Sequence, residues 1–126
     1  MKLKSLITAC AVTALALGSI AARAADVEVS CEKRSNRSRA SVDGNNLKTG
    51  SYRAVLKSGD HVARSPFAQT IGDEVEFDFD SNPNDVAEGA TQISPSFIVD
   101  GRVRGHLVDA SGTRVTPVVT AICRVR

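Results

Sequence analysis

The feature that most constrains the fold of this chain is a strict alternation of apolar and charged side chains between Val75 and Asp80. Val75, Phe77 and Phe79 share one face of this segment, and the intervening acids share the other. A period of two is typical of a β-strand with one buried and one solvated face. The same alternation recurs in three more segments, residues 27–32, 51–58 and 115–125. The sequence therefore predicts an all-β fold.

Turn signals separate the alternating segments. Asp100-Gly101 lies between Phe97–Val99 and Arg102–Arg104 and predicts a two-residue hairpin turn of type I′ between two strands. Residues 43–46 and 110–112 have the composition of two further turns. Short strands joined by tight turns favour a sandwich or a barrel.

The segment from Ser81 to Gly89 departs from the strand pattern and predicts one or two turns of helix. Ser81 or Asn82 supplies an N-cap, Pro83 suits the first helical position, and Gly89 can end the helix. We expect this short helix to form a crossover between strands.

About seven strands, dense turns and one short crossover helix predict an immunoglobulin-like antiparallel β-sandwich. A small Greek-key barrel is the alternative. The stretch Val108–Val115 resembles hairpins of many exported immunoglobulin-like modules, and that resemblance carries no functional residue. The residues expected in the core are Tyr52, Leu56, Val75, Phe77, Phe79, Phe97 and Val119.

Residues 1–24 have the composition of a secretory signal peptide. A lysine-containing start precedes an apolar stretch from Leu6 to Ile20, and Ala22-Arg23-Ala24 matches a cleavage site. The apolar stretch is too short for a transmembrane anchor. We therefore expect a cleaved signal, a single domain over residues 25–126, no membrane anchor and a periplasmic or secreted location.

Loss of the signal changes the charge balance of the chain. The full sequence has 16 basic and 14 acidic side chains, a net charge of +2. Three basic residues lie before residue 25, so 13 remain against 14 acids, and the net charge becomes −1. Nothing in this balance favours binding to nucleic acid or to an anionic membrane.

Two cysteines, Cys31 and Cys123, remain in the expected domain, because Cys10 falls within the signal. In an oxidising compartment they predict one disulfide between the first and the last strand. A thiol nucleophile or a metal-binding pair is the competing interpretation. Neither is favoured, since the chain has no C-x-x-C spacing and no histidine next to either cysteine.

An acidic segment over residues 65–101 contains no lysine or arginine. Within it Asp78, Asp80, Asn82 and Asp85 offer oxygen ligands of the kind that calcium prefers. The spacing departs from an EF-hand, which needs glycine where Pro83 stands. The competing interpretation is structural: the acids pair with basic neighbouring strands, and Asn82 caps the helix.

A basic stretch contains Arg34, Arg37 and Arg39, which are candidates for contact with an anion or a partner. Strand alternation places Arg37 and Arg39 on one face. No aromatic residue is interleaved with these arginines, so base stacking is not supported. The competing interpretation is a solvated strand that faces the acidic segment.

Catalytic chemistry has few candidates in this sequence. His61 and His106 are its histidines, and neither lies in a recognisable catalytic or cofactor-binding motif. The sequence offers few aromatic side chains on which a sugar could stack, because it has no tryptophan and one tyrosine. We expect a non-enzymatic exported binding or accessory domain that acts on an envelope or extracellular macromolecule and needs no cofactor. The alternatives are a divalent-ion-binding domain and a small hydrolase that uses His61 or His106.

Overall fold

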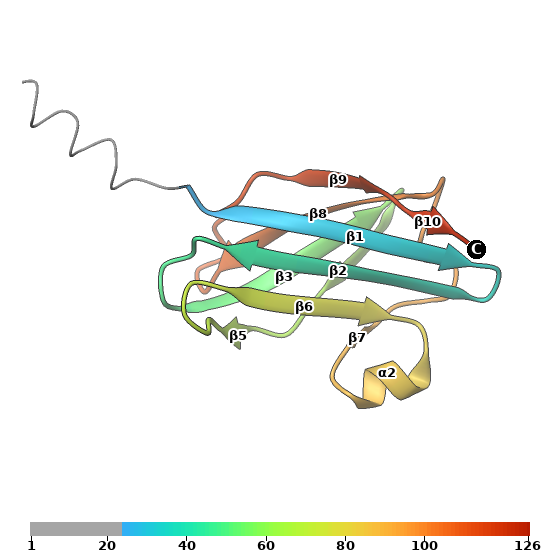
Figure 1. The fold of residues 1–126 in the computed structure, drawn as a ribbon, viewed down its shortest axis with the longest axis horizontal. Coiled ribbons are helices and arrows are strands. Elements are labelled where there is room, and N and C mark those ends of the chain that lie inside the picture. The colour runs from blue at the N-terminus through green and yellow to red at the C-terminus, as the bar shows by residue number, and fades with distance from the viewer. Residues whose placement is uncertain (1–23) are drawn as a thin grey trace, which may run out of the picture.

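Two β-sheets pack face to face in a computed structural model, which describes residues 24–126 (Figure 1). Sheet A has the order β10-β1-β2-β6-β7, and sheet B has the order β4-β3-β8-β9 with β5 paired to β3. The strands of sheet A are β1 (Asp26–Arg34), β2 (Arg37–Asn45), β6 (Val75–Asp80), β7 (Thr91–Gln92) and β10 (Arg124–Val125). Those of sheet B are β3 (Ser51–Ser58), β4 (His61–Arg64), β5 (Ala68–Gln69), β8 (Arg102–Asp109) and β9 (Val119–Ile122).

The all-β sandwich predicted from the sequence is confirmed, and the two sheets do not close into a barrel within the described residues. Seven strands have at least four residues, and the three others are two-residue strands at the margins of the sheets. No helix in the range 24–126 is long and apolar enough to cross a membrane.

The core lies between the sheets and is built from the inward positions of the alternating strands. Val42, Leu56, Val103 and Leu107 are fully buried, and the side chain of Phe79 is almost so. Six of the seven core residues predicted from the sequence are buried. Val119 is only partly buried, because β9 lies at the edge of sheet B.

The chain turns at a later position in the sequence than the composition of residues 43–46 predicts. Strand β2 continues through Gly44 to Asn45, and the chain turns at Asn46, which has a φ of +57°. Gly44 faces the core, where a Cβ atom would collide with the side chain of Leu107. The glycine here therefore allows close packing of the sheets rather than a turn.

The predicted helix is confirmed as α2, which spans Pro83–Ala87. Asn82 is the N-cap, and its side chain accepts a hydrogen bond from the backbone N–H of Asn84 at 2.8 Å. Helix α2 follows β6 and leads into β7, which pairs with β6 in parallel (Figure 1). A crossover is what two parallel strands require.

The hairpin at Asp100-Gly101 has the predicted turn but lacks one of the predicted strands. Both turn residues have positive φ, +55° and +65°, as a type I′ turn requires. The segment Phe97–Val99 is a buried loop, with a single bridge from Val99 to Arg102.

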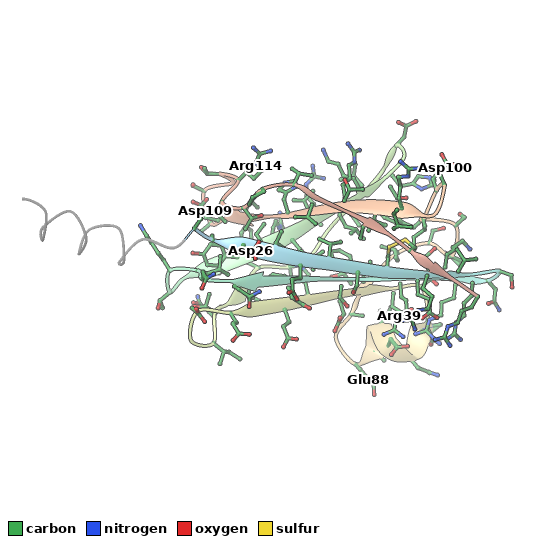
Figure 2. All side chains as sticks on the ribbon, turned by 45° about the horizontal axis from the view of Figure 1, so that its top comes forward. Asp26, Arg39, Glu88, Asp100, Asp109 and Arg114 are labelled. Carbon is green, nitrogen blue, oxygen red and sulfur yellow. A yellow bond between two sulfur atoms is a disulfide. The ribbon has the colours of Figure 1, made fainter. Side chains whose placement is uncertain are left out.

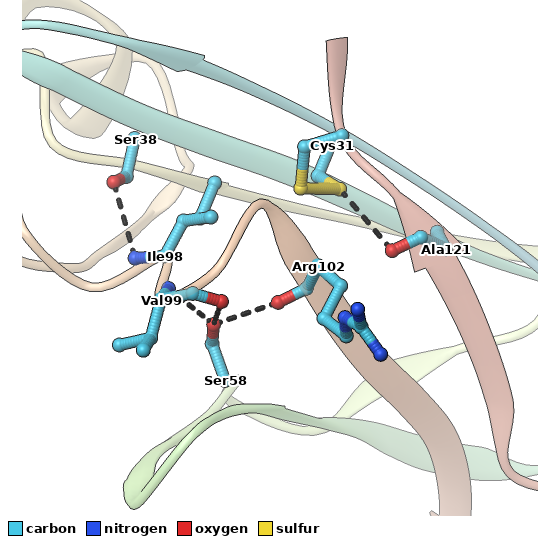
Figure 3. The surroundings of a disulfide bond; sticks show 8 residues. Cys31, Ser38, Ser58, Ile98, Val99, Arg102 and Ala121 are labelled. Carbon is cyan, nitrogen blue, oxygen red and sulfur yellow. Dashed lines mark hydrogen bonds between the residues drawn. A yellow bond between two sulfur atoms is a disulfide. The ribbon is translucent and has the colours of Figure 1, made fainter. Parts of the chain in front are cut away.

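Two buried serines take the place of a sheet partner for this loop (Figure 3). The N–H of Ile98 donates to the Ser38 hydroxyl at 3.3 Å, and the N–H of Val99 donates to the Ser58 hydroxyl at 2.7 Å. Ser58 in turn donates to the carbonyl of Arg102 at 2.7 Å. A loop can be buried only where its backbone groups find such partners.

The long last strand expected over residues 115–125 is divided between the sheets. Strand β9 pairs with β8 in sheet B, and β10 pairs in parallel with β1 in sheet A. Cys123 lies at the crossing point, where its N–H donates to the carbonyl of Gly101 at 2.8 Å. Pro117 lies outside both strands, where its missing N–H interrupts no ladder of hydrogen bonds.

The predicted disulfide between Cys31 and Cys123 is confirmed (Figure 3). Their Cα atoms are 4.6 Å apart, and the bridge closes a loop with a sequence separation of 92. It joins β1 to the junction of β9 and β10, so it ties the start of the domain to its end. The chain-entropy model assigns about 4–5 kcal/mol to a loop of this length.

We predict that the double variant Cys31→Ser/Cys123→Ser unfolds at lower denaturant concentration than the parent chain, with a loss of about 2–5 kcal/mol. Chemical denaturation with and without a reductant measures this loss. The reductant should shift the parent curve and leave the variant unmoved. Two free thiols in the folded parent, detected by mass analysis after alkylation, would contradict the bridge.

Candidate functional site on the outer faces of the two sheets

The outer face of sheet A carries a row of carboxylates. Glu28, Asp43 and Glu76 lie directly opposite one another on β1, β2 and β6, and Asp78 follows Glu76 on the same face. Like charges in opposed positions of a sheet destabilise it. Burial and these acidic neighbours raise the pKa of Asp43 to about 6, from an ordinary value of 3.8. We call Glu28, Asp43, Glu76 and Asp78 the acidic row.

The other end of sheet A is neutralised by an internal ion pair. Arg37 donates to Asp80 through Nε at 3.0 Å and Nη2 at 2.7 Å, and to Asp85 through Nη2 at 2.8 Å. Burial opposes the ionisation of Asp80, but hydrogen bonds from Arg37 and the N–H of Asn82 outweigh it. They hold the pKa of Asp80 below its usual range. This pair anchors α2 to the end of β6.

The four residues predicted as calcium ligands do not converge on one point. Asp80 and Asp85 meet Arg37, and Asn82 caps α2. Asp78 accepts a hydrogen bond from the Ser41 hydroxyl at 2.9 Å. Within residues 24–126 no group of three or more His, Cys, Asp or Glu is placed to hold a metal ion. Calcium binding by these four residues therefore stays an alternative that a calcium titration tests.

The three arginines predicted as anion contacts have different surroundings. Arg37 is occupied by Asp80 and Asp85, and Arg34 Nε lies 2.7 Å from the Glu32 carboxylate. Arg39 is exposed and opposes Glu32 and Asp80 across the sheet. Most of the positive charge of this stretch is thus matched by acids of sheet A.

The outer face of sheet B is basic, and sequence reasoning missed it. Arg53 and Lys57 lie on β3, and exposed arginines project from β4, β8 and the turn beyond β8. Figure 2 shows nitrogen-tipped side chains projecting between Arg114 and Asp100, at the two ends of β8. We call the following residues the basic face: Arg53, Lys57, Arg64, Arg102, Arg104, His106 and Arg114.

No acidic side chain of residues 24–126 forms an ion pair with the basic face. The ion pairs among the described residues involve Arg34, Arg37 and Arg126, and none includes a member of the basic face. Lys57 lies directly opposite Arg104. In residues 53–57 and 102–106 the basic side chains are separated by even numbers of positions, which places those of each strand on one face. This signal could be recognised only once the pairing of β3 with β8 was known.

The two histidines predicted as catalytic candidates lie in different surroundings. His61 Nδ1 is 2.8 Å from the carbonyl oxygen of Phe97, and its ring packs against the Phe97 ring with centroids 5.6 Å apart. His106 is half-buried in the basic face. Burial and the charges of Lys57, Arg114 and Arg64 lower its pKa. The hollow next to His106 is lined by no serine, cysteine or carboxylate.

A larger hollow of about 540 Å³ lies along the seam between β1 and the β9–β10 segment, beside the disulfide. Ile122 borders it and is 86% exposed, and Val125 on β10 is 71% exposed. This seam is the open side of the sandwich, where the edges of the two sheets approach each other. Its lining mixes apolar side chains with Glu32, Arg39 and Arg124, so charges of both signs are present there.

Searches of protein-family models, curated proteins and solved structures return no significant match to this chain. The functional assignment therefore depends on the chemistry of its surface.

We predict that Asp43→Asn stabilises the protein at about pH 8 by ~1 kcal/mol, a figure reduced for solvent screening. The folded pKa of Asp43 is about 6, above its ordinary 3.8, so the folded state holds this proton more tightly than the unfolded chain does. The bound proton therefore stabilises the folded parent chain. This stabilisation is complete below pH 3.8 and is lost as the pH rises through about 6. Denaturant unfolding of parent and variant at about pH 8 and below pH 3.8 measures the difference.

The stabilisation by Asp43→Asn should vanish well below pH 3.8, where the parent side chain is neutral in both the folded and the unfolded chain. Asp60→Asn, in an exposed turn, is the matched control and should change stability little at either pH. A variant less stable than the parent at about pH 8 would show that the acidic row does not repel itself.

We predict that millimolar calcium leaves the melting curve of the protein unmoved. Asn82→Ala should lower stability by about 1 kcal/mol, because a helix N-cap is lost. Thermal unfolding with calcium and with a chelator tests both statements. A melting temperature that rises with calcium in the parent but not in Asp78→Asn would establish an ion site instead.

Proposed function

We propose that this chain is a small exported, non-enzymatic binding domain whose basic face binds an anionic polysaccharide of the cell envelope or its surroundings. The observation that carries the proposal is the separation of charge in a nearly neutral domain. Seven residues of basic type gather on one outer face, and none is in an ion pair within the described residues.

The arrangement of these cations suits a long anionic ligand. Strands in a sheet lie about 4.8 Å apart, and same-face residues follow one another about 6.6 Å along a strand. The cations therefore form a two-dimensional array rather than a single charged point. An extended polymer with repeated anionic groups can meet several of them at once, and each contact relieves repulsion such as that between Lys57 and Arg104.

The composition of the face favours a polysaccharide over single-stranded nucleic acid. Phe67 is 43% exposed and lies against Arg53, but no row of aromatics accompanies the cations. Nucleic-acid-binding sheets use successive aromatic rings on which bases stack. Sugars that carry sulfate, phosphate or carboxylate groups are bound through hydrogen bonds and charge, which arginine and lysine supply.

Export is supported by the disulfide, which is compatible with a periplasmic or extracellular location. The signal-like residues 1–23 lie outside the described part of the chain. An immunoglobulin-like class is supported by strand order, with β1, β2 and β6 in one sheet and β3, β4, β8 and β9 in the other. The bridge differs from that of antibody domains, because it joins the margins of the sheets.

Binding to dextran sulfate, with uncharged dextran as the matched polymer, tests this function. The variant Lys57→Ser/Arg104→Ser removes two charges from the basic face, and Arg34→Ser/Arg39→Ser removes two from sheet A. We predict roughly tenfold weaker binding for the first variant, which corresponds to about 1.4 kcal/mol, and little change for the second. Binding should also weaken as salt is raised.

Equal loss in the two variants would mean that net charge alone drives adsorption and would overturn the proposed surface. No binding to dextran sulfate at low salt would overturn the proposal that the ligand is an anionic polysaccharide. Parallel measurements use vesicles of anionic phospholipid and a single-stranded oligonucleotide. Tighter binding to either would assign the basic face to that class of ligand instead.

A further inference from the structure

One hollow of about 270 Å³ is set into the basic face between β3, β4 and β8. Cationic and apolar side chains line it, and no acidic side chain does. The residues that line it are Arg53, Val55, Lys57, Arg64, Phe67, His106, Val108 and Gly112. Such a combination accepts a charged group attached to an organic body.

Arg53 is held in place before any ligand arrives. Its Nε donates to the carbonyl of Ser65 at 2.9 Å, and its guanidinium lies 4.4 Å from the centroid of the Phe67 ring. Ser65 is itself buried and accepts a hydrogen bond from the N–H of Ala54 at 2.9 Å. Within the described residues the terminal nitrogens of Arg53 make no hydrogen bond, so they remain able to donate to an anion.

His106 is surrounded by positive charge from every neighbouring element that carries a titratable group. Strand β3 contributes Arg53 and Lys57, β4 contributes Arg64, and the segment after β8 contributes Arg114. Arg104 lies two positions away on β8, and β9 has no titratable side chain. These charges and partial burial lower the pKa of His106, which favours its neutral form at neutral pH.

We propose that this hollow binds one oxyanion, a sulfate, phosphate or carboxylate group, between Arg53, Lys57, Arg64 and His106, and that His106 gains a proton as the anion enters. An anion placed among these cations reverses the potential that keeps the imidazole neutral. Proton uptake and anion binding then strengthen each other by the same factor. The anchoring of a polymer by this group rests on the proposed function, whereas binding of the free oxyanion does not.

Sulfate is the probe that isolates the response of the protein, because it remains a dianion across the pH range of histidine titration. Its affinity can be followed from the imidazole NMR signals of His106, with chloride at matched ionic strength as the reference. We expect affinity to rise towards tenfold between about pH 8 and about pH 5, since one pKa unit of coupling is a factor of ten. Inorganic phosphate and acetate distinguish the three anionic groups.

Three variants separate the roles of the side chains. His106→Gln should bind sulfate with an affinity independent of pH and close to that of the parent at about pH 8. Arg64→Gln should weaken binding several-fold at every pH, and its exposed position makes unfolding a small concern. Arg39→Gln, on the opposite sheet, should bind as the parent does, and its melting curve provides the matched control.

A response to sulfate no larger than that to chloride would overturn the site. Retention of the full pH dependence in His106→Gln would overturn the role of the histidine. If free sulfate does not bind, but binding of dextran sulfate still depends on Lys57 and Arg104, the oxyanion site is overturned and the proposed function stands. If free sulfate binds as expected and the polymer does not, the oxyanion site stands and the polysaccharide falls.

Discussion

The bond between Cys31 and Cys123 lies where the end of the chain passes from one sheet to the other. Because β9 pairs in sheet B and β10 in sheet A, the last residues close one side of the sandwich. Both β9 and β10 are short, and Ile122 at the end of β9 is almost fully exposed. Apolar burial therefore stabilises this end of the chain only weakly. The covalent bridge holds the β9–β10 junction against β1.

The rest of the domain uses buried polar groups where strand pairing runs out. Ser38, Ser58 and Ser65 are almost fully inaccessible, and each bonds to the backbone of another segment. In the described residues no buried side-chain nitrogen or oxygen lacks a partner. Phe97 and Ile98 can therefore enter the core from a loop. Ser65 has the further effect of fixing Arg53, which links the packing of the core to the charge of the surface.

Local pattern was enough for the elements that obey it. The alternation around Phe77, the Asp100-Gly101 turn, the cap at Asn82 and the cysteine pairing were all predicted. The apolar run Phe97–Val99 was misread, because side-chain hydroxyls far away in sequence satisfy its backbone. The division of residues 115–125 between sheets depends on what each half meets across space. The basic face and the acidic row were missed for the same reason, since register between strands assembles them.

Because the acidic row and the basic face lie on opposite sheets, together they contribute an electric dipole directed from one sheet to the other. A nearly neutral body with such a dipole feels little net force far from a charged surface, but it does feel a torque. Rotation then precedes attraction, and sheet B turns towards negative charge before contact. If the basic face binds an anionic surface as proposed, the acidic row points away from that surface, and an occupied layer would present new negative charge to the next molecule that approaches.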